Sequence, residues 1–233
     1  MVGSIASMPA LPLPRSPRVL RRTALGALLG MAGGALARGK PADEVLLRFS
    51  HVVAPDTPKG QMALRFQALV RELSGGRVRV EVYPDSTLWG DGDEMEALRL
   101  GAVEMLAPSL SKFGHAGMPE FEVFDLPYLF DELAQVRQVT QGTVGRELLR
   151  RLERQQMLGL GFLDNGFKQM SALRALRAPA DFQGLRVRVQ ASGVLNAQMQ
   201  ALGARPVALP FGETERALAQ GVVDAAENPV SNY

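Results

Sequence analysis

The sequence predicts an α/β fold with largely parallel sheets, built as two lobes of related construction. Strand and helix patterns alternate as β-α-β-α-β between residues 45 and 107, which is typical of a parallel sheet with helices on its faces. A similar alternation follows between residues 184 and 226. The two regions also share a spacing: Ala97-Leu98-x-x-Gly101-x-Val103-Glu104 recurs as Ala217-Leu218-x-x-Gly221-x-Val223-Asp224. Helix-Gly-strand units are common in α/β proteins, so chance similarity is the alternative to a true repeat.

The composition is that of a globular protein and excludes several kinds of site. The 233 residues are 46% hydrophobic, enough for one large domain or two small ones with a real core. The chain has no cysteine, which excludes disulfides, thiolate metal sites, a cysteine nucleophile and a lipid-anchor cysteine. His51 and His115 are the two histidines, so histidine catalysis has little to draw on.

The first 37 residues have the features of an export signal. Residues 1–22 contain four arginines and no acid, and residues 23–37 carry no charge and end in Ala35-Leu36-Ala37. This small-x-small ending is typical of a signal-peptidase site, and the apolar run is shorter than the ~20 residues that span a bilayer. Arg21-Arg22 fits Tat export as well as Sec export. The alternative is a buried helix, which the glycines of the run disfavour.

The net charge changes once this segment is set aside. The whole chain has 26 basic and 24 acidic residues, and removal of four arginines leaves 22 against 24, a net charge of −2. The remaining arginine clusters are short, so we expect no nucleic-acid binding. No later stretch is long and apolar enough to predict a membrane span. The expected product is soluble and periplasmic.

The first half of the remaining chain contains the first set of elements. A buried strand is expected at 45–53, followed by a helix that begins near Asp56 or Thr57 with Pro58 in its first turn and stops at Gly75-Gly76. Residues 78–82 alternate as a strand with one buried face. A short helix at 93–100 and a strand at 103–107 follow. Further on, 133–156 is predicted helical with a possible break at Gly142.

The second half repeats the alternation. Strands are predicted at 157–163, 184–190, 207–209 and 222–226, with helices at 193–202 and about 213–220.

Several polar groups fall at or just after the predicted strand ends, where ligands of parallel sheets bind. They include cations, amides and hydroxyls, with no prominent acid, and this set suits a small organic anion in a cleft between the lobes. Arginine matches a carboxylate with two parallel hydrogen bonds. The residues are His51, Lys59, Ser109, Lys112, Asn165, Lys168, Arg188 and Asn228.

Each of these residues has a plainer interpretation. Arg186 and Arg188 share the non-apolar face of their strand, so either could be solvated. Exposed lysines are ordinary. His51 fits a wall residue better than a metal ligand, and Asn228-Pro229 is itself a turn signal.

Five segments of the chain resemble the extracytoplasmic solute-binding proteins of TRAP transporters, the DctP family, and most closely their C4-dicarboxylate-binding branch. The resemblance runs from about residue 45 to the last residue. The segments are FSHVVAPDTPKG (49–60), GRVRVEVYPDSTLWGDGDEMEALRLGAVEMLAPS (76–109), DNGFKQMS (164–171), GLRVRVQAS (184–192) and AAENPVSNY (225–233).

The resemblance implies a two-lobed periplasmic-binding-protein-like architecture with a ligand cleft between lobes I (43–163) and II (164–233). It implies a monomer that captures a small carboxylate, such as malate, succinate or fumarate, and delivers it to the TRAP permease subunits in the membrane. No enzymatic activity, cofactor or metal is implied. An enzyme on a similar scaffold would need a nucleophile–base pair or a metal.

The family's ligand contacts match individual positions of this sequence. Its carboxylate-pairing arginine matches Arg188, its turn asparagine Asn228, its basic residue Lys168 and its packing aromatic Phe211. Contacts are further expected at His51, Lys59, Trp89 and Ser109. Gln190 stands where many members have proline.

The family continues well beyond the turn at Asn228-Pro229, whereas this sequence ends at Tyr233. We therefore expect the C-terminal part of lobe II to be missing, with poor folding and weak ligand retention as consequences. Two alternatives to a TRAP protein stay open: a carboxylate-binding sensor module or another transporter class's binding protein, and a non-functional fragment.

Overall fold

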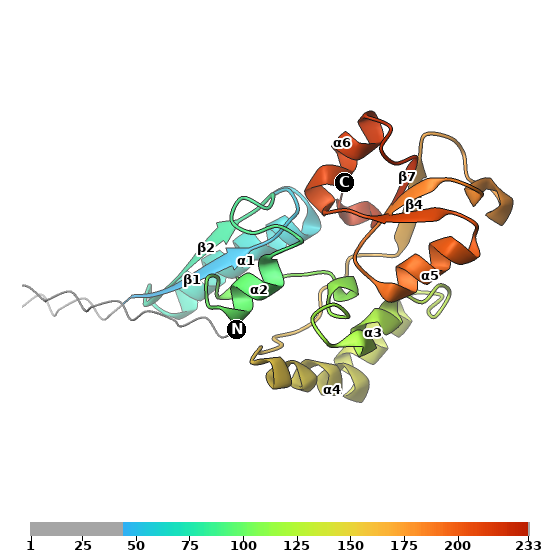
Figure 1. The fold of residues 1–233 in the computed structure, drawn as a ribbon. Helices are drawn as coiled ribbons and strands as arrows, with labels where there is room; N and C mark the ends of the chain where they lie inside the picture. The colour runs from blue at the N-terminus through green and yellow to red at the C-terminus, as the bar shows by residue number, and fades with distance from the viewer. Residues whose placement is uncertain (1–43, 233) are drawn as a thin grey trace, which may run out of the picture. The chain divides into compact units, whose positions relative to one another are not determined.

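The computed structural model describes residues 44–232, and the export signal predicted at 1–37 lies outside them. The described residues belong to one compact unit. Strands and helices alternate in its first and last thirds (Figure 1). The strands are β1 (Val45–Ser50), β2 (Val78–Tyr83), β3 (Met105–Leu106), β4 (Lys168–Ala172), β5 (Arg186–Val189), β6 (Arg205–Ala208) and β7 (Ala225–Pro229). The α-helices are α1 (Pro58–Leu73), α2 (Glu94–Arg99), α3 (Leu133–Gln141), α4 (Thr143–Arg151), α5 (Gly193–Ala201) and α6 (Thr214–Ala219).

The first sheet has the strand order β2-β1-β3, and all of its pairings are parallel. Helix α1 packs along β1 and β2, as Figure 1 shows. Phe49 of β1, Val80 of β2 and Ala63 of α1 are buried together in this small core. The parallel β-α-β order follows from these alternating apolar residues and confirms the sequence prediction for this region.

Helix α1 begins and ends as its sequence predicts. The Thr57 hydroxyl accepts a hydrogen bond from the Gly60 amide at 3.2 Å, and Pro58 occupies the first turn, where a missing N–H costs nothing. Past the helix, Gly75 and Gly76 have φ values of +61° and +78°, which disfavour any residue with a side chain. These local signals explain why the helix bounds could be read from sequence.

The second sheet has the order β4-β7-β5-β6. Strand β5 is parallel to β6 and β7, while β4 is antiparallel to β7. Val187 and Val189 of β5 pack against Leu195 and Met199 of α5 in a buried core. The sheet is thus largely parallel, as predicted, with the edge strand β4 as its antiparallel member.

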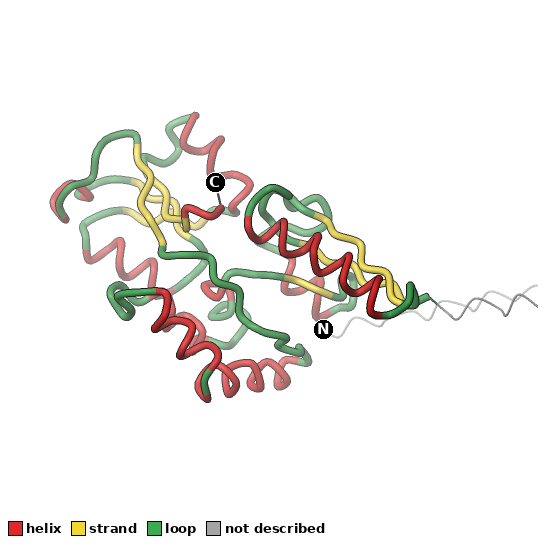
Figure 2. The backbone as a smooth tube through the Cα atoms, turned by 180° about the vertical axis from the view of Figure 1, so that it is seen from behind, coloured by secondary structure: helices red, strands yellow, loops and turns green. Residues whose placement is uncertain are grey.

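Helices and long loops fill the sequence between the two sheets (Figure 2). Helices α3 and α4 are separated at Gly142, which confirms the predicted break. A β-carbon at Gly145 in α4 would lie 1.9 Å from the Thr140 carbonyl oxygen, so the close turn requires glycine. The 3-10 helix η2 (Pro119–Asp125) reaches the second sheet's helix, because Glu122 Oε2 accepts a hydrogen bond from the Val194 amide at 3.2 Å.

The predicted internal repeat has a matching structure in both sheets. In the first, Glu104 binds Arg48 of β1 through the backbone N at 2.7 Å, Nε at 3.0 Å and Nη2 at 2.6 Å. In the second, Asp224 binds Arg186 of β5 through the same three atoms at 2.8, 3.0 and 2.7 Å. The same acid–arginine clasp in both halves favours a true repeat over chance similarity.

This clasp predicts a pH dependence of stability. The hydrogen bonds from Arg186 lower the pKa of Asp224 to about 2. A depressed carboxylate pKa stabilises the folded state above the unfolded value of about 4, and the stabilisation is lost as pH falls from there toward 2. The melting temperature of Asp224→Asn should therefore lie below that of the unmodified chain at pH 7, and the gap should close between about pH 4 and 2. Thermal melts across this range test it, with the exposed Asp131→Asn as control. A gap that persists unchanged at pH 2 would contradict the assignment.

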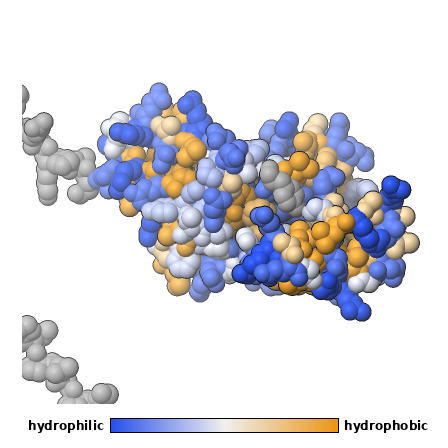
Figure 3. All heavy atoms as spheres, turned by 90° about the horizontal axis from the view of Figure 1, so that it is seen from above, coloured by the Kyte–Doolittle hydropathy of each residue, from blue (hydrophilic) through white to orange (hydrophobic). Residues whose placement is uncertain are grey.

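Three strand predictions need correction. No strand forms at 157–163; the chain there is extended without ladder pairing among the described residues, and the strand comes later, as β4. β3 is only two residues long, and β7 begins at Ala225 rather than 222. An apolar run predicts burial, but Leu158 and Leu160 are 74% and 70% exposed because nothing described packs on them. Apolar residues reach the surface in several places on the face shown in Figure 3.

The predicted lobe boundaries, 43–163 and 164–233, stay a prediction, although each sheet falls inside one of these ranges. Within residues 44–232 no helix combines the length and apolarity needed to cross a bilayer.

Candidate ligand-binding site

A small cavity lies where the carboxyl ends of strands from both sheets meet. Its volume is about 20 Å³, room for roughly one water molecule. Its lining combines basic, amide and hydroxyl side chains with one acid and one aromatic ring. The lining residues are Val52, Lys59, Asp91, Ser109, Lys112, Asn165, Arg188, Gln190, Phe211, Asn228 and Asn232. Five of the eight predicted ligand contacts are among them: Lys59, Ser109, Arg188, Phe211 and Asn228.

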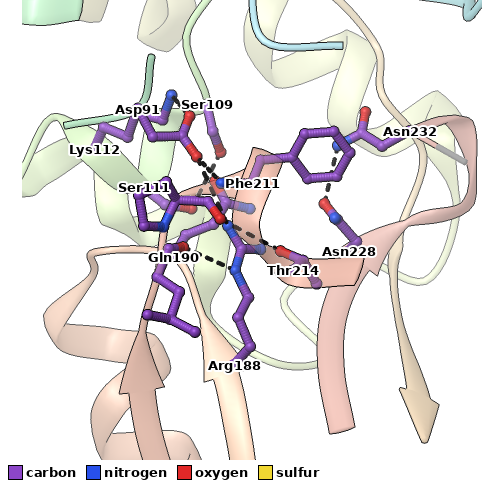
Figure 4. Close-up of polar contacts among 12 residues, drawn as sticks. Asp91, Ser109, Ser111, Lys112, Arg188, Gln190, Phe211, Thr214, Asn228 and Asn232 are labelled. Carbon is purple, nitrogen blue, oxygen red and sulfur yellow. Dashed lines mark hydrogen bonds and ion pairs between the residues drawn. The ribbon is translucent and has the colours of Figure 1, made fainter. Parts of the chain in front are cut away.

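Arg188 is the central cation of this cavity and is only 1% exposed. Its Nε donates to the Leu209 carbonyl at 2.9 Å, and its Nη1 donates to the Glu227 carbonyl at 3.4 Å. Its Nη2 lies 3.8 Å from Asp91 Oδ2 (Figure 4). The interpretation of Arg188 as a solvated surface residue is therefore wrong, whereas Arg186, two residues earlier, does lie at the surface in its clasp with Asp224.

Lys168 lies at the same edge of the sheet, but its position in the strand order differs from the predicted one. It does not follow a strand but begins β4, and because β4 is antiparallel to β7 it lies opposite Pro229 at the end of β7. Its ammonium binds Ser111 Oγ at 3.0 Å, Asp125 at 2.7 Å and Glu227 at 3.3 Å. Lys168 is not among the lining residues of this cavity.

Asn228 and Phe211 line the cavity from neighbouring elements. Asn228 lies within β7, not after it, is 1% exposed, and accepts a hydrogen bond from Asn232 Nδ2 at 2.9 Å. Phe211 begins the 3-10 helix η5 (Phe211–Glu213), and its backbone amide donates to Asp91 Oδ2. Figure 4 shows both residues with Arg188 at the site. Phe211 is only partly buried.

Lys59, in the first turn of α1, and Ser109, shortly after β3, also line the cavity. Lys59 Nζ donates to the Ala107 carbonyl at 3.2 Å. Burial and the nearby Lys112 ammonium lower the pKa of Lys59 to about 8. Ser109 Oγ lies 3.3 Å from the Ser111 hydroxyl. A lysine with a pKa near 8 gains charge readily when an anion approaches it.

His51 and Trp89 are not among the cavity's lining residues. His51 is 1% exposed, and burial together with Lys59 lowers its pKa. Trp89 instead exchanges backbone hydrogen bonds with the Ser50 hydroxyl at 3.3 Å. No group of three or more His, Asp or Glu side chains with metal-binding geometry occurs within the described part of the chain.

The sequence predicted no prominent acid at this site, and this prediction is wrong. Asp91 and Glu94 both form ion pairs with the buried Lys112, and Asp125 and Glu227 do so with Lys168. Burial raises the pKa of Glu94 despite Lys112. Asp91, Glu94 and Asp125 were missed because they follow no predicted strand end, whereas Glu227 directly follows the strand predicted at 222–226 and was overlooked. The sequence signal for Asp91 and Glu94 is the acidic loop GDGDE at 90–94.

This arrangement can bind an anion. A guanidinium fixed by two carbonyls, two nearby ammonium groups and an amide side chain form a preorganised set of donors around the cavity. The role of each predicted contact in ligand binding remains a prediction, because the structure gives only its position.

Sequence comparison places these features in a known family. Residues 49–233 match the family model "DctP: Bacterial extracellular solute-binding protein, family 7". The chain belongs to this family. It is 53% identical over 216 residues to the "C4-dicarboxylate-binding periplasmic protein DctP" of Rhodobacter capsulatus, covering 92% of this chain and 65% of that protein. Family 7 is a class of solute-binding proteins, not an enzyme class.

Solved structures of the family share the fold. A TRAP periplasmic solute-binding protein from Shewanella oneidensis with bound succinate is 46% identical, with a TM-score of 0.79 over 81% of this chain and 62% of that one. Another, from Pseudomonas aeruginosa PAO1 with bound L-malate, is 48% identical, with a TM-score of 0.76 over 79% of this chain and 64% of that one. The predicted two-lobed α/β fold class is thereby confirmed. The chain spans slightly less than two thirds of the length of these relatives.

Proposed function

We propose that this family 7 protein binds a small organic acid, a C4-dicarboxylate such as succinate, malate or fumarate. The observation that carries the proposal is Arg188, whose buried guanidinium is fixed by the Leu209 and Glu227 carbonyls at the edge of the cavity. A planar guanidinium held in this way matches one carboxylate. Lys59 also lines the cavity, and burial and the Lys112 ammonium lower its pKa, so the negative charge of a second carboxylate would stabilise its ammonium form. The ligands bound to the succinate- and malate-containing relatives support this choice.

The proposal extends to the part that the protein plays in transport. The protein acts as a monomer, as the periplasmic binding component of a TRAP transporter, and delivers its ligand to the membrane permease without chemical change. Support comes from the names of the relatives, which describe periplasmic binding proteins, and from the export signal predicted at 1–37. Ligand-dependent uptake by membrane vesicles that contain the cognate permease tests the delivery step, and uptake that ignores added protein would refute it.

Binding itself predicts a thermal stabilisation. At a ligand concentration about a hundred times its Kd, a ligand that binds only the folded state stabilises it by about 2.7 kcal/mol. For a chain of this size we expect succinate, L-malate or fumarate to raise the melting temperature by about 5–10 °C. Succinamide, which has the same skeleton without charge, should cause no shift. Thermal-shift and titration calorimetry measure both, and equal shifts with the diacid and the diamide would contradict carboxylate recognition.

A further inference from the structure

Asp91 places a carboxylate of the protein itself at the anion position of the site. It lies in the loop between β2 and α2, and its side chain is 12% exposed. Its Oδ1 forms an ion pair with Lys112, and its Oδ2 accepts the backbone amide of Phe211. The same Oδ2 lies 3.8 Å from Arg188 Nη2. Figure 4 labels both residues at the site. A guanidinium, an ammonium and a backbone N–H are the donors that a bound carboxylate ligand uses.

The environment keeps Asp91 charged. Burial on its own would raise the pKa of Asp91, but Lys112, the Phe211 amide and Arg188 together lower it below its ordinary value. Asp91 is therefore ionised at neutral pH and competes for cations as a carboxylate, not as a neutral acid.

The cavity beside Asp91 is too small for a second carboxylate, and the negative charge of Asp91 would repel one. The cavity holds about 20 Å³, whereas ligand pockets are typically about 300–1,000 Å³. The other buried acids of the site, Glu94, Asp125 and Glu227, are paired with Lys112 or Lys168. Asp91 is the acid of this group that faces Arg188. A ligand carboxylate can reach Arg188 in this arrangement only by displacing Asp91.

We propose that Asp91 is an internal competitor: it occupies the anion position beside Arg188 in the ligand-free protein, and a ligand carboxylate must displace it. This inference rests on the proposed function. It makes Asp91 a determinant of affinity and specificity, because a neutral hydroxyl or amide cannot replace a carboxylate between Arg188 and Lys112. The apparent affinity is reduced by the fraction of molecules in which Asp91 holds the site.

The substitution Asp91→Asn tests the proposal because asparagine keeps the shape and one acceptor oxygen but removes the charge. We expect the affinity for succinate, measured by titration calorimetry, to increase about tenfold, mainly through faster association. The melting temperature of the ligand-free variant should fall at the same time, because Lys112 and Arg188 lose a partner. A purely structural role would lower both stability and affinity. Unchanged or weaker binding by Asp91→Asn would overturn the proposal.

Asp93→Asn is the matched control. Asp93 lies two residues away in the same loop, is exposed, and makes no side-chain capping bond to α2. Its substitution removes the same charge from the same loop and should leave succinate affinity unchanged. If Asp93→Asn tightens binding as much as Asp91→Asn does, general electrostatics accounts for the effect and the proposal is wrong.

A second measurement does not depend on any ligand. Phenylglyoxal modifies accessible guanidinium groups, and mass spectrometry reports the rate at each arginine. Arg188 should react several-fold faster in Asp91→Asn than in the unmodified chain or in Asp93→Asn, and an equal rate in all three would overturn the proposal. If none of the three proteins binds succinate, the proposed function fails, and the labelling rates alone decide whether Asp91 blocks Arg188.

Discussion

Arg188→Lys is expected to weaken succinate binding by at least about thirtyfold, equivalent to about 2 kcal/mol or more. The guanidinium uses Nε and Nη1 to hold the Leu209 and Glu227 carbonyls, and the same rigid group faces the cavity with Nη2. Lysine keeps the charge, but a single ammonium cannot hold both carbonyls and also present a planar fork to a carboxylate. Titration calorimetry on the purified chain measures the loss.

Arg186→Lys is the matched control for this prediction. Arg186 lies on the same strand, is 42% exposed and pairs with Asp224, so its substitution should leave succinate affinity unchanged. Arg188→Ala is a poorer probe. It would leave two buried carbonyls without their donor, at a cost of about 1–3 kcal/mol each, so binding and folding would fail together. Equal affinities of the Arg188→Lys and unmodified chains would refute the role of Arg188.

The parts of the fold that local signals determine could be predicted from the sequence. Thr57, Pro58 and the Gly75-Gly76 pair set the ends of α1, and Gly142 separates α3 from α4. The internal repeat was visible as spacing alone, and the structure adds its physical cause. Glu104 and Asp224 each bind an arginine on the neighbouring strand through the same three nitrogen atoms. This contact requires an acid at the same position in both halves, and the shared spacing in the sequence reflects that requirement.

Long-range strand pairing could not be predicted in the same way. The apolar run at 157–163 has strand composition, but a strand needs a partner, and none of the described residues pairs with it. The segment KQMSA, which mixes polar and apolar residues, forms β4 instead, because its backbone pairs with β7 in the antiparallel direction. The same error misplaced Lys168 in the fold, because it begins an antiparallel strand and does not follow a parallel one.

The electrostatics of the site was the least predictable feature. Placing polar groups at strand ends found Arg188, Asn228, Lys59 and Ser109 because parallel strands bring their ends to one edge. Three of the acids that neutralise this edge, Asp91, Glu94 and Asp125, come from a loop, a short helix and a 3-10 helix, whose positions depend on tertiary packing. Asp91 is the clearest case, since it meets Phe211 across 120 residues of sequence.

Lys112→Met is expected to destabilise the chain by about 3–5 kcal/mol, because removing one partner of a buried ion pair leaves uncompensated charge. The side chains of Lys112, Asp91 and Glu94 are 8%, 12% and 1% exposed, and the lysine contacts both carboxylates. Methionine fills similar volume, so the loss reports charge rather than a void. For a chain of this size the melting temperature should fall by about 10 °C or more. Thermal and denaturant melts measure it.

The pH dependence of this deficit identifies its cause. Burial already raises the pKa of Glu94. Without Lys112 that pKa rises further, so the folded state is penalised above the unfolded carboxyl value of about 4.3 and recovers as pH falls through the folded value. The deficit of Lys112→Met should be larger at pH 8 than at pH 5, and adding Glu94→Gln should restore part of it. Arg99→Met, which breaks the exposed pair with Glu96 on the same helix, should change the melting temperature little. A deficit that is independent of pH and unaffected by Glu94→Gln would mean that Lys112 stabilises the site by packing, not by charge.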